Sequence, residues 1–167
     1  MNVNAVGKLR LLELADDRRD AVLSIQLHDH QVDYLPSIQS SLEMAERYPN
    51  SRSLVFDVDG SIVGYGLYGI DDETGAWKIF RLYIDKNHQS KGFGRAAMQL
   101  LLQQLEDDHG ASEVLIVYNG DNKAAEHLYQ SIGFVPYAHR DDKVLARYDC
   151  STRIYPYKSG ARIAEDL

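Results

Sequence analysis

The stretch His-Gln-Ser-Lys-Gly-Phe-Gly-Arg at residues 88–95 restricts the possible folds of this chain more than any other feature. It follows the apolar run at residues 76–85 and overlaps residues 92–108, where apolar side chains recur at helical spacing until Gly110. The two glycines thus lie where a strand passes into a helix. Because the first N–H groups of a helix have no intrahelical partner, and glycines let a ligand approach them, the sequence predicts an anion site here.

The other periodicities predict a mixed α/β domain. We expect strands at residues 9–15 and 76–85, a hairpin within 53–70 that turns at Asp59-Gly60, a buried strand at 113–119 and a final strand pair within 134–150 around Asp141-Asp142. Helices are expected within residues 16–27, from Pro36 to Pro49, at 92–108, and at 122–132 with Asp121 as cap and Gly133 as stop. The strands up to residue 85 should form an antiparallel meander, and the helix at 92–108 should cross to a parallel strand at 113–119.

Composition narrows the function classes. The 167 residues predict one domain over 1–167, with a core at about 8–149 and a tail at 150–167. A net charge of -7 argues against nucleic acid and suits a cationic partner. The single cysteine, Cys150, permits no intrachain disulfide, and no Cys/His cluster indicates a metal. Without an apolar segment of ~20 residues, we expect no membrane span and a cytoplasmic location.

Several anion-binding loops contain a glycine pair. Residues 92–97 fit the G-x-G-x-x-A pattern of dinucleotide folds, but there the glycines follow the strand directly and an acidic residue ends the next strand, whereas residues 113–119 end in Tyr118-Asn119. A Walker loop places its lysine after the second glycine, and here Lys91 precedes the pair. A plain strand-to-helix turn stays open as a third interpretation.

Two linked motifs carry a family resemblance. Gln89-x-x-Gly92-x-Gly94 resembles the Q/R-x-x-G-x-G/A pyrophosphate loop of the GNAT superfamily of acyl-CoA-dependent N-acetyltransferases. The residues Asn119, Asn122, Ala125, Leu128, Tyr129, Gly133 and Phe134 resemble that superfamily's next segment. The resemblance covers about residues 8–149 and implies a seven-stranded, mostly antiparallel sheet with about four helices, acetyl-CoA as cosubstrate and no metal.

Within the superfamily, the segment from His28 to Gly94 looks most like the bacterial diamine and polyamine (spermine/spermidine) N-acetyltransferases. Tyr34 and Leu35 depart from it, since a phenylalanine-valine type pair is expected there. The resemblance implies a primary amine of a small cationic molecule as acceptor, and a possible homodimer. Another amine (an amino-acid-like amine, an aminoglycoside, a peptide or protein N-terminus) and a non-catalytic acyl-CoA-binding module stay open.

The resemblance assigns residues to acetyl-CoA. Tyr129 would protonate the departing thiolate, and it lies two helical turns after Asn122, which would bond the pantetheine arm. Backbone groups of the strand and residues of the glycine loop would hold the remainder of the cofactor: Leu82, Tyr83, Ile84, Gln89, Ser90, Lys91, Gly92, Phe93, Gly94 and Arg95.

The amine site is predicted from aromatic and acidic residues, which can hold a cation. The candidates are His28, Gln31, Tyr34, Glu43, Tyr68, Asp71 and Trp77. The general base is sought among Glu43, Asp33, Asp71, Asp72 and Glu73. Along residues 65–68, alternation permits only one set of side chains to face the substrate.

Overall fold

The computed structural model describes residues 3–152 and contains a seven-stranded sheet in the order β1-β2-β3-β4-β5-β7-β6. The strands are β1 Leu9–Glu13, β2 Ser51–Val58, β3 Ser61–Ile70, β4 Trp77–Ile84, β5 Glu113–Asn119, β6 Val135–Arg140 and β7 Lys143–Asp149. The helices are α1 Val3–Val6, α2 Arg19–Leu23, α3 Ile38–Arg47, α4 Phe93–His109 and α5 Lys123–Ile132. The pair β4–β5 is parallel and the other neighbouring pairs are antiparallel, so the predicted mixed sheet is confirmed.

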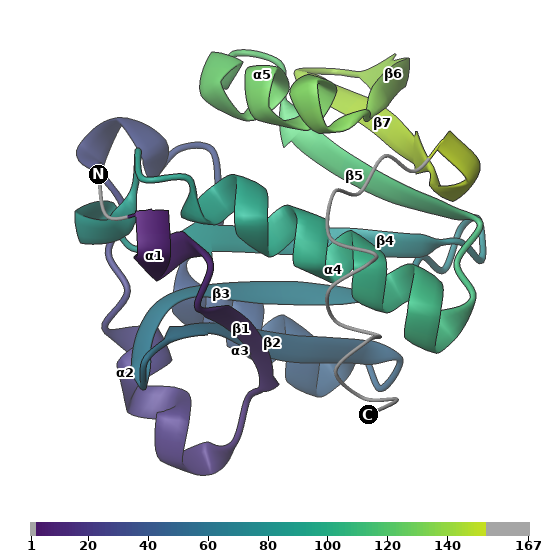
Figure 1. Ribbon diagram of the computed structural model, residues 1–167. Coiled ribbons are helices and arrows are strands. Elements are labelled where there is room, and N and C mark those ends of the chain that lie inside the picture. Colours follow the sequence, from purple (N-terminus) through teal and green to yellow (C-terminus); the bar gives the residue numbers. More distant parts are fainter. Residues whose placement is uncertain (1–2, 153–167) are drawn as a thin grey trace.

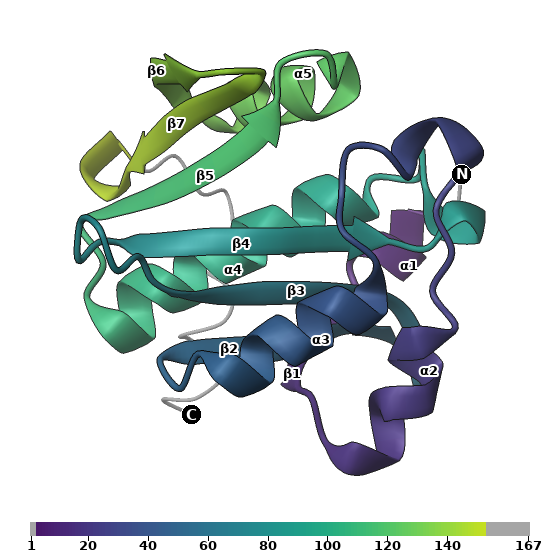
Figure 2. The same cartoon turned by 180° about the vertical axis from the view of Figure 1, so that it is seen from behind.

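Helices cover both faces of the sheet (Figures 1 and 2). On one face α4 buries Ala97, Met98, Leu101 and Leu105 against the sheet. The helical spacing predicts a face of Ala96, Leu100, Leu101 and Leu105, of which Ala96 and Leu100 are only partly buried. On the other face α2 and α3 enclose a second cluster that includes Val22, Leu42, Tyr65 and Tyr83. Each strand in the middle of the sheet therefore has one side chain set facing α4 and the other facing α3.

Element ends depart from the sequence expectations in three places. The helix expected within 16–27 is the 3-10 turn Asp16–Arg18 followed by the short α2. The helix α1 was not predicted. Asn122 rather than Asp121 caps α5, because the Asn122 Oδ1 accepts a hydrogen bond from Ala125 N at 3.2 Å. The turn at Asp59-Gly60 is confirmed, with φ of 51° and 87° at its two residues.

A bulge interrupts β4 beside β3. Leu67 lies opposite Arg81, but Tyr68 lies opposite Ile79, so Phe80 is an extra residue on β4. After the bulge, Leu82 and Ile84 pack on the α4 side of the sheet and Tyr83 packs on the α3 side. Arg81 also points to the α3 side, where its Nε donates to Ser41 Oγ at 3.3 Å.

The strands β4 and β5 separate after three residue pairs. These pairs are Trp77–Val114, Lys78–Leu115 and Ile79–Ile116. Beyond them, β4 runs on to Ile84 beside β3, and β5 runs on to Asn119 beside β7. Figure 1 shows the two ribbons close together at their starts and widely separated where α4 begins. Each strand therefore presents an open edge to the other, with backbone N–H and C=O groups that none of the seven described strands pairs.

Candidate active site

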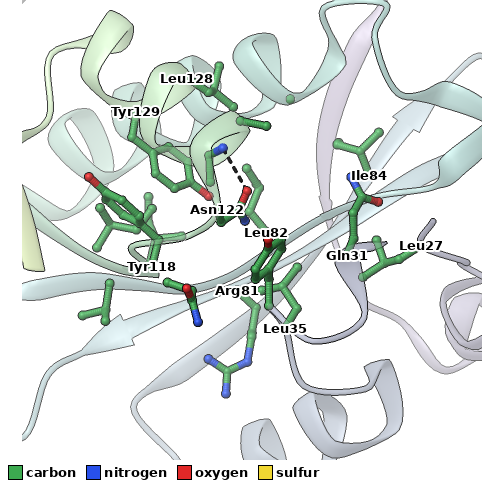
Figure 3. Close-up of a pocket in the computed structure, with 18 of the residues that line it drawn as sticks. Leu27, Gln31, Leu35, Arg81, Leu82, Ile84, Tyr118, Asn122, Leu128 and Tyr129 are labelled. Atoms are coloured by element: carbon green, nitrogen blue, oxygen red, sulfur yellow. Dashed lines mark hydrogen bonds between the residues drawn. The ribbon is translucent and has the colours of Figure 1, made fainter. Parts of the chain in front are cut away.

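A cleft of about 300 Å³ lies where β4 and β5 separate. The strand β4 forms one wall, β5 and α5 form the other, and residues 27–35 close one end. Figure 3 shows the labelled side chains converging from these segments. The lining residues are Leu27, Gln31, Tyr34, Leu35, Ile79, Phe80, Arg81, Leu82, Ile84, Gln89, Ser90, Gly94, Ile116, Val117, Tyr118, Asn119, Asn122, Ala124, Ala125, Leu128 and Tyr129.

The register of β4 decides which of its backbone groups face this cleft. In an antiparallel pair, successive residues direct their N–H and C=O alternately toward the partner strand and away from it. Asp85 N donates to Val63 O at 2.9 Å, so Asp85 and, two residues earlier, Tyr83 face β3. Leu82 and Ile84 therefore direct their backbone groups into the cleft.

Tyr83 does not offer its backbone to the cleft, contrary to the prediction. Its side chain is also turned away, because the phenol is buried on the α3 side. There its hydroxyl donates to Pro36 O at 2.6 Å and lies 2.7 Å from Ser41 Oγ. The role of Tyr83 is therefore to hold the segment that precedes α3 against β4.

The glycine loop forms an open cradle at the start of α4. Gly92 caps the helix in a left-handed conformation with φ of 89°, and Ser90 also has a positive φ of 60°. No side chain caps this helix end, so its first N–H groups stay available to an anion. A Cβ on Gly94 would lie 3.6 Å from Leu128, and the bare glycine keeps this wall of the cleft thin. The geometry fits a pyrophosphate held by backbone groups.

The charged side chains of the cradle lie at its outer surface. Lys91 and Arg95 are exposed, with Lys91 Nζ donating to Asn87 O at 3.1 Å and Arg95 donating to Ser131 Oγ at 2.7 Å. Phe93 instead points inward and packs in the core beneath α4. The charged side chains thus lie at the rim of the cradle, and backbone N–H groups form its centre.

Across the cleft from β4, α5 presents the two residues predicted to work together. Asn122 and Tyr129 both line the cleft, and Figure 3 shows them on the wall that faces Leu82. Capping occupies the Asn122 Oδ1, which leaves the Nδ2 donors for a ligand. The spacing of seven residues thus places one amide and one phenol over the open edge of β4.

Comparison with known proteins decides the family. Residues 19–134 match the family model described as "Acetyltransferase (GNAT) family", which spans more than half of the chain. The chain belongs to the GNAT acetyltransferases. It is accordingly an enzyme that transfers an acetyl group from acetyl-CoA to an amine.

Curated relatives of this GNAT acetyltransferase include enzymes with different acceptors. It is 27% identical over 132 residues to a probable spermine N(1)-acetyltransferase of Bacillus subtilis subsp. natto, covering 75% of this chain and 87% of the relative. It is 30% identical over 91 residues to the L-amino acid N-acyltransferase MnaT of Escherichia coli, covering 49% of each chain.

The fold is also that of a solved polyamine enzyme. The structure of spermidine N-acetyltransferase from Vibrio cholerae in complex with CoA and spermine superposes with a TM-score of 0.67 at 18% identity. The match covers 84% of this chain and 94% of that one. At this identity the likeness establishes the shared GNAT fold.

The environment of Tyr129 keeps its hydroxyl protonated. Burial raises the pKa of Tyr129 to about 12, and the neighbouring phenol of Tyr118, whose ring centre lies 5.5 Å away, acts in the same direction. In this GNAT acetyltransferase, the Tyr129 hydroxyl is therefore a proton or hydrogen-bond donor at all pH values near neutrality. The same burial would disfavour a CoA thiolate beside the Tyr129 hydroxyl. Proton transfer from the phenol to the sulfur would therefore replace one destabilised anion, the thiolate, by another, the phenolate.

These pKa shifts predict a loss of stability in alkali. Between pH 10 and about 12 the folded protein keeps the Tyr129 proton, whereas the unfolded chain, with a tyrosine pKa of 10.0, releases it. The free energy of unfolding should therefore fall as pH rises above 10, by at most about 1.4 kcal/mol per pH unit for each such tyrosine. Burial also raises the pKa values of Tyr65, Tyr83 and Tyr118, so the loss should be steep. Urea unfolding at pH 9 and pH 11 measures it, and equal stability at the two pH values would contradict it.

Five predicted amine-binding residues lie outside the cleft lining: His28, Glu43, Tyr68, Asp71 and Trp77. Tyr68 and Trp77 face α4, where the Trp77 ring stacks on His109 at 4.4 Å and the Tyr68 hydroxyl lies 3.3 Å from His109 Nε2. Alternation along β3 does separate the two sets, but it places Tyr65 and Leu67 on the α3 side and Tyr68 on the other. Asp71 forms an ion pair with Lys78 Nζ at 2.9 Å. Burial alone would raise the pKa of Asp71, but its ion pair and hydrogen bonds outweigh that effect and lower the pKa.

The other amine-binding candidates lie in the segment beside the cleft or in α3. Gln31 and Tyr34 line the cleft, and the Tyr34 hydroxyl donates to Asp121 O at 3.4 Å. His28 is exposed and stacks on His30, with ring centres 5.7 Å apart. Glu43, on α3, accepts from Gln39 Nε2 at 3.0 Å and does not line the cleft.

None of the candidate bases lines the cleft. Glu73 Oε2 accepts from Arg140 at 3.2 Å, and Asp33 and Asp72 are exposed. Within the part of the chain that the structure describes, no carboxylate lines the cleft, so a proton would leave the amine through water or through an uncharged polar group.

Sequence reasoning missed part of the lining. Tyr118 and Asn119 end β5 at its carboxyl edge, a position where parallel strands commonly hold ligands, so their place could have been predicted. The place of Arg81 could not have been predicted, because the bulge at Phe80 determines the face of the sheet to which Arg81 points.

The described residues of the GNAT acetyltransferase contain neither a cluster of metal-ligating side chains nor a membrane-spanning helix. Over residues 3–152, no three His, Cys, Asp or Glu side chains gather closely enough to hold a metal ion. Within the same residues, every helix is too short or too polar to cross a bilayer.

Proposed function

We propose that this GNAT acetyltransferase acetylates a primary amine of a polyamine or diamine such as spermine or spermidine. The cleft carries the acetyl-transfer part of the proposal, because it sets the Tyr129 hydroxyl opposite the open backbone of Leu82. The net charge of -7 and the spermine acetyltransferase relative support the cationic acceptor. The cytoplasmic location and the homodimer remain predictions.

The residues of the cleft can support each step of the transfer. The Leu82 N–H can polarise the thioester carbonyl while a neutral amine forms the new C–N bond and the C–S bond breaks. The Tyr129 hydroxyl can then donate to the sulfur, and the proton lost by nitrogen leaves toward water. Asn122 Nδ2 and the backbone of Ile84 would hold the pantetheine arm between the two strands, as an added strand is held.

One observation favours a second acceptor class, an amine that also carries a carboxylate. Among residues 3–152, Arg81 is the one charged side chain that lines the cleft. Its described contacts are with neutral groups: Ser41 Oγ, the Phe80 carbonyl at 2.6 Å and Met44 Sδ at 3.7 Å. A guanidinium in this state can pair with a carboxylate, as in an amino acid or a peptide. The amino-acid N-acyltransferase relative supports this alternative.

An acceptor panel separates the two classes. Free-thiol release from acetyl-CoA should be measured with spermine, spermidine, putrescine, an aminoglycoside, a neutral amino acid and a short peptide. We expect kcat/KM for spermine or spermidine to exceed that for the amino acid and the peptide by at least about tenfold. The reverse order would assign the Arg81 class instead, and Arg81→Met should then lose more than about tenfold on carboxylate-bearing amines alone.

A non-catalytic role has a distinct outcome in the same assay. If acetyl-CoA binds but no amine in the panel releases thiol, the acyl-CoA-binding module becomes the better interpretation. Turnover of any amine excludes it.

A further inference from the structure

Two glutamines link the glycine cradle to the segment that closes the cleft. Gln31 Nε2 donates to Gln89 Oε1, and Gln89 Nε2 donates to Gln31 Oε1, both at 2.8 Å. Gln89 is the first residue of the cradle motif, and Gln31 ends the 3-10 turn Asp29–Gln31. Both side chains line the cleft.

Further hydrogen bonds extend this pair in both directions. Gln31 Oε1 also accepts from His28 N at 3.1 Å, and Gln89 Nε2 also donates to Ile84 O at 2.9 Å. A side-chain amide has two N–H donors, so both donors of Gln89 are used within the protein. The Gln89 side chain therefore has no donor left for a phosphate in this structure, and we assign that side chain a positioning role.

The segment from Gln26 to Pro36 is attached at its two ends by other contacts. Gln26 N donates to Asp85 Oδ1 at 2.9 Å, and Pro36 O accepts from the Tyr83 hydroxyl at 2.6 Å. His28, Asp29 and His30 are exposed, so packing restrains this part of the segment little. Of the contacts described for the segment, the Gln31 amide is the one that reaches the cradle.

We propose that the Gln31–Gln89 pair couples the CoA site to the amine site. A pyrophosphate that orders the backbone of Ser90 to Gly94 would fix Gln89, and Gln89 would fix Gln31 with its neighbours Tyr34 and Leu35 at the amine end of the cleft. Because such coupling is reciprocal, a bound amine would raise CoA affinity by the same factor. The inference rests on the proposed acetyl transfer, but not on which amine is the acceptor.

Hydrogen exchange tests the first half of the coupling without any amine. Peptides spanning residues 27–36 should be followed in the wild type with and without CoA. We expect CoA to slow their exchange several-fold, and this slowing should disappear in Gln31→Leu. Gln31→Glu keeps the acceptor for His28 N and Gln89 Nε2 but loses the donor, so it should retain part of the effect. Gln103→Leu, on α4 and outside the cleft lining, serves as the control and should behave as the wild type.

Binding measurements test the second half. In the wild type, saturating spermine should lower the Kd of CoA by about fivefold or more, which corresponds to about 1 kcal/mol. In Gln31→Leu that factor should approach one, and the KM for the amine should rise with kcat little changed. Gln31→Leu and Gln89→Leu combined should be no worse than Gln89→Leu alone, since each single change already breaks the pair.

The outcomes separate this inference from the proposed function. Unchanged exchange of residues 27–36 on adding CoA, or a CoA effect that survives in Gln31→Leu, would overturn the coupling even if polyamines are acetylated. Protection by CoA that depends on Gln31 would support the coupling even if the panel shows a different acceptor.

Discussion

Gly92→Val should weaken CoA binding by roughly a hundredfold, because a β-branched residue at a φ of 89° carries about 1–3 kcal/mol of backbone strain. Relief of that strain would turn the first N–H groups of α4 away from the pyrophosphate. Isothermal titration with CoA measures the affinity directly. A Kd within about threefold of the wild-type value would contradict the backbone cradle.

The chain provides a matched control for this strain. Gly110 caps the other end of α4 with a φ of 64°. A Cβ on Gly110 would meet nothing within 4 Å, and a Cβ on Gly92 would have its nearest atom 3.8 Å away, so neither Cβ causes a steric clash. Gly110→Val should therefore lower the unfolding free energy in the same way as Gly92→Val and leave CoA affinity unchanged.

Tyr129→Phe should lower kcat about a hundredfold or more while the Kd of acetyl-CoA stays within about threefold, because loss of a general acid removes a contribution to the transition state alone. The raised pKa adds a pH criterion. The hydroxyl keeps its proton until about pH 12, so the wild-type rate should show no loss from Tyr129 ionisation below about pH 11. Stopped thiol-release assays across pH 7–10 give kcat and its pH dependence, and isothermal titration gives the Kd of acetyl-CoA.

Tyr137→Phe is the control for this change. Tyr137 lies on β6, is 44% exposed and does not line the cleft, so its substitution should leave kcat unchanged. Equal kcat for Tyr129→Phe and the wild type would remove Tyr129 from the mechanism and make water the proton donor.

Much of the fold could be predicted because local signals and long-range packing agree. The repeat of apolar residues in 92–108 predicts the helix α4, and Asp59-Gly60 predicts the turn between β2 and β3. The short α2 was overestimated, because apolar residues such as Ile25 and Leu27 pack from irregular backbone as well as from a helix. Periodicity reports that a side chain is buried, but not that its backbone is helical.

More of the residues predicted for the cofactor line the cleft than of those predicted for the amine. The glycine loop, Asn122 and Tyr129 come from the two motifs that carry the family resemblance, and residues of both motifs line the cleft. The amine candidates Tyr68, Asp71 and Trp77 were chosen by residue type, and alternation along β3 does not tell which of its two side chain sets lies nearer the cleft. The direction of Arg81 depends instead on the bulge at Phe80. One extra residue in a strand moves every later side chain to the other face, and single-sequence alternation does not detect it.

The separation of β4 from β5 also has a mechanical consequence. Three residue pairs are the whole of the backbone ladder between the four strands β1–β4 and the three strands β5–β7. The sheet thus consists of two parts that meet along a short seam of three residue pairs, and the chain segment containing α4 connects the two parts covalently. A molecule that bonds to both open edges completes the missing length of that seam. Cosubstrate binding in this enzyme should therefore stiffen the whole sheet, well beyond the atoms that it touches.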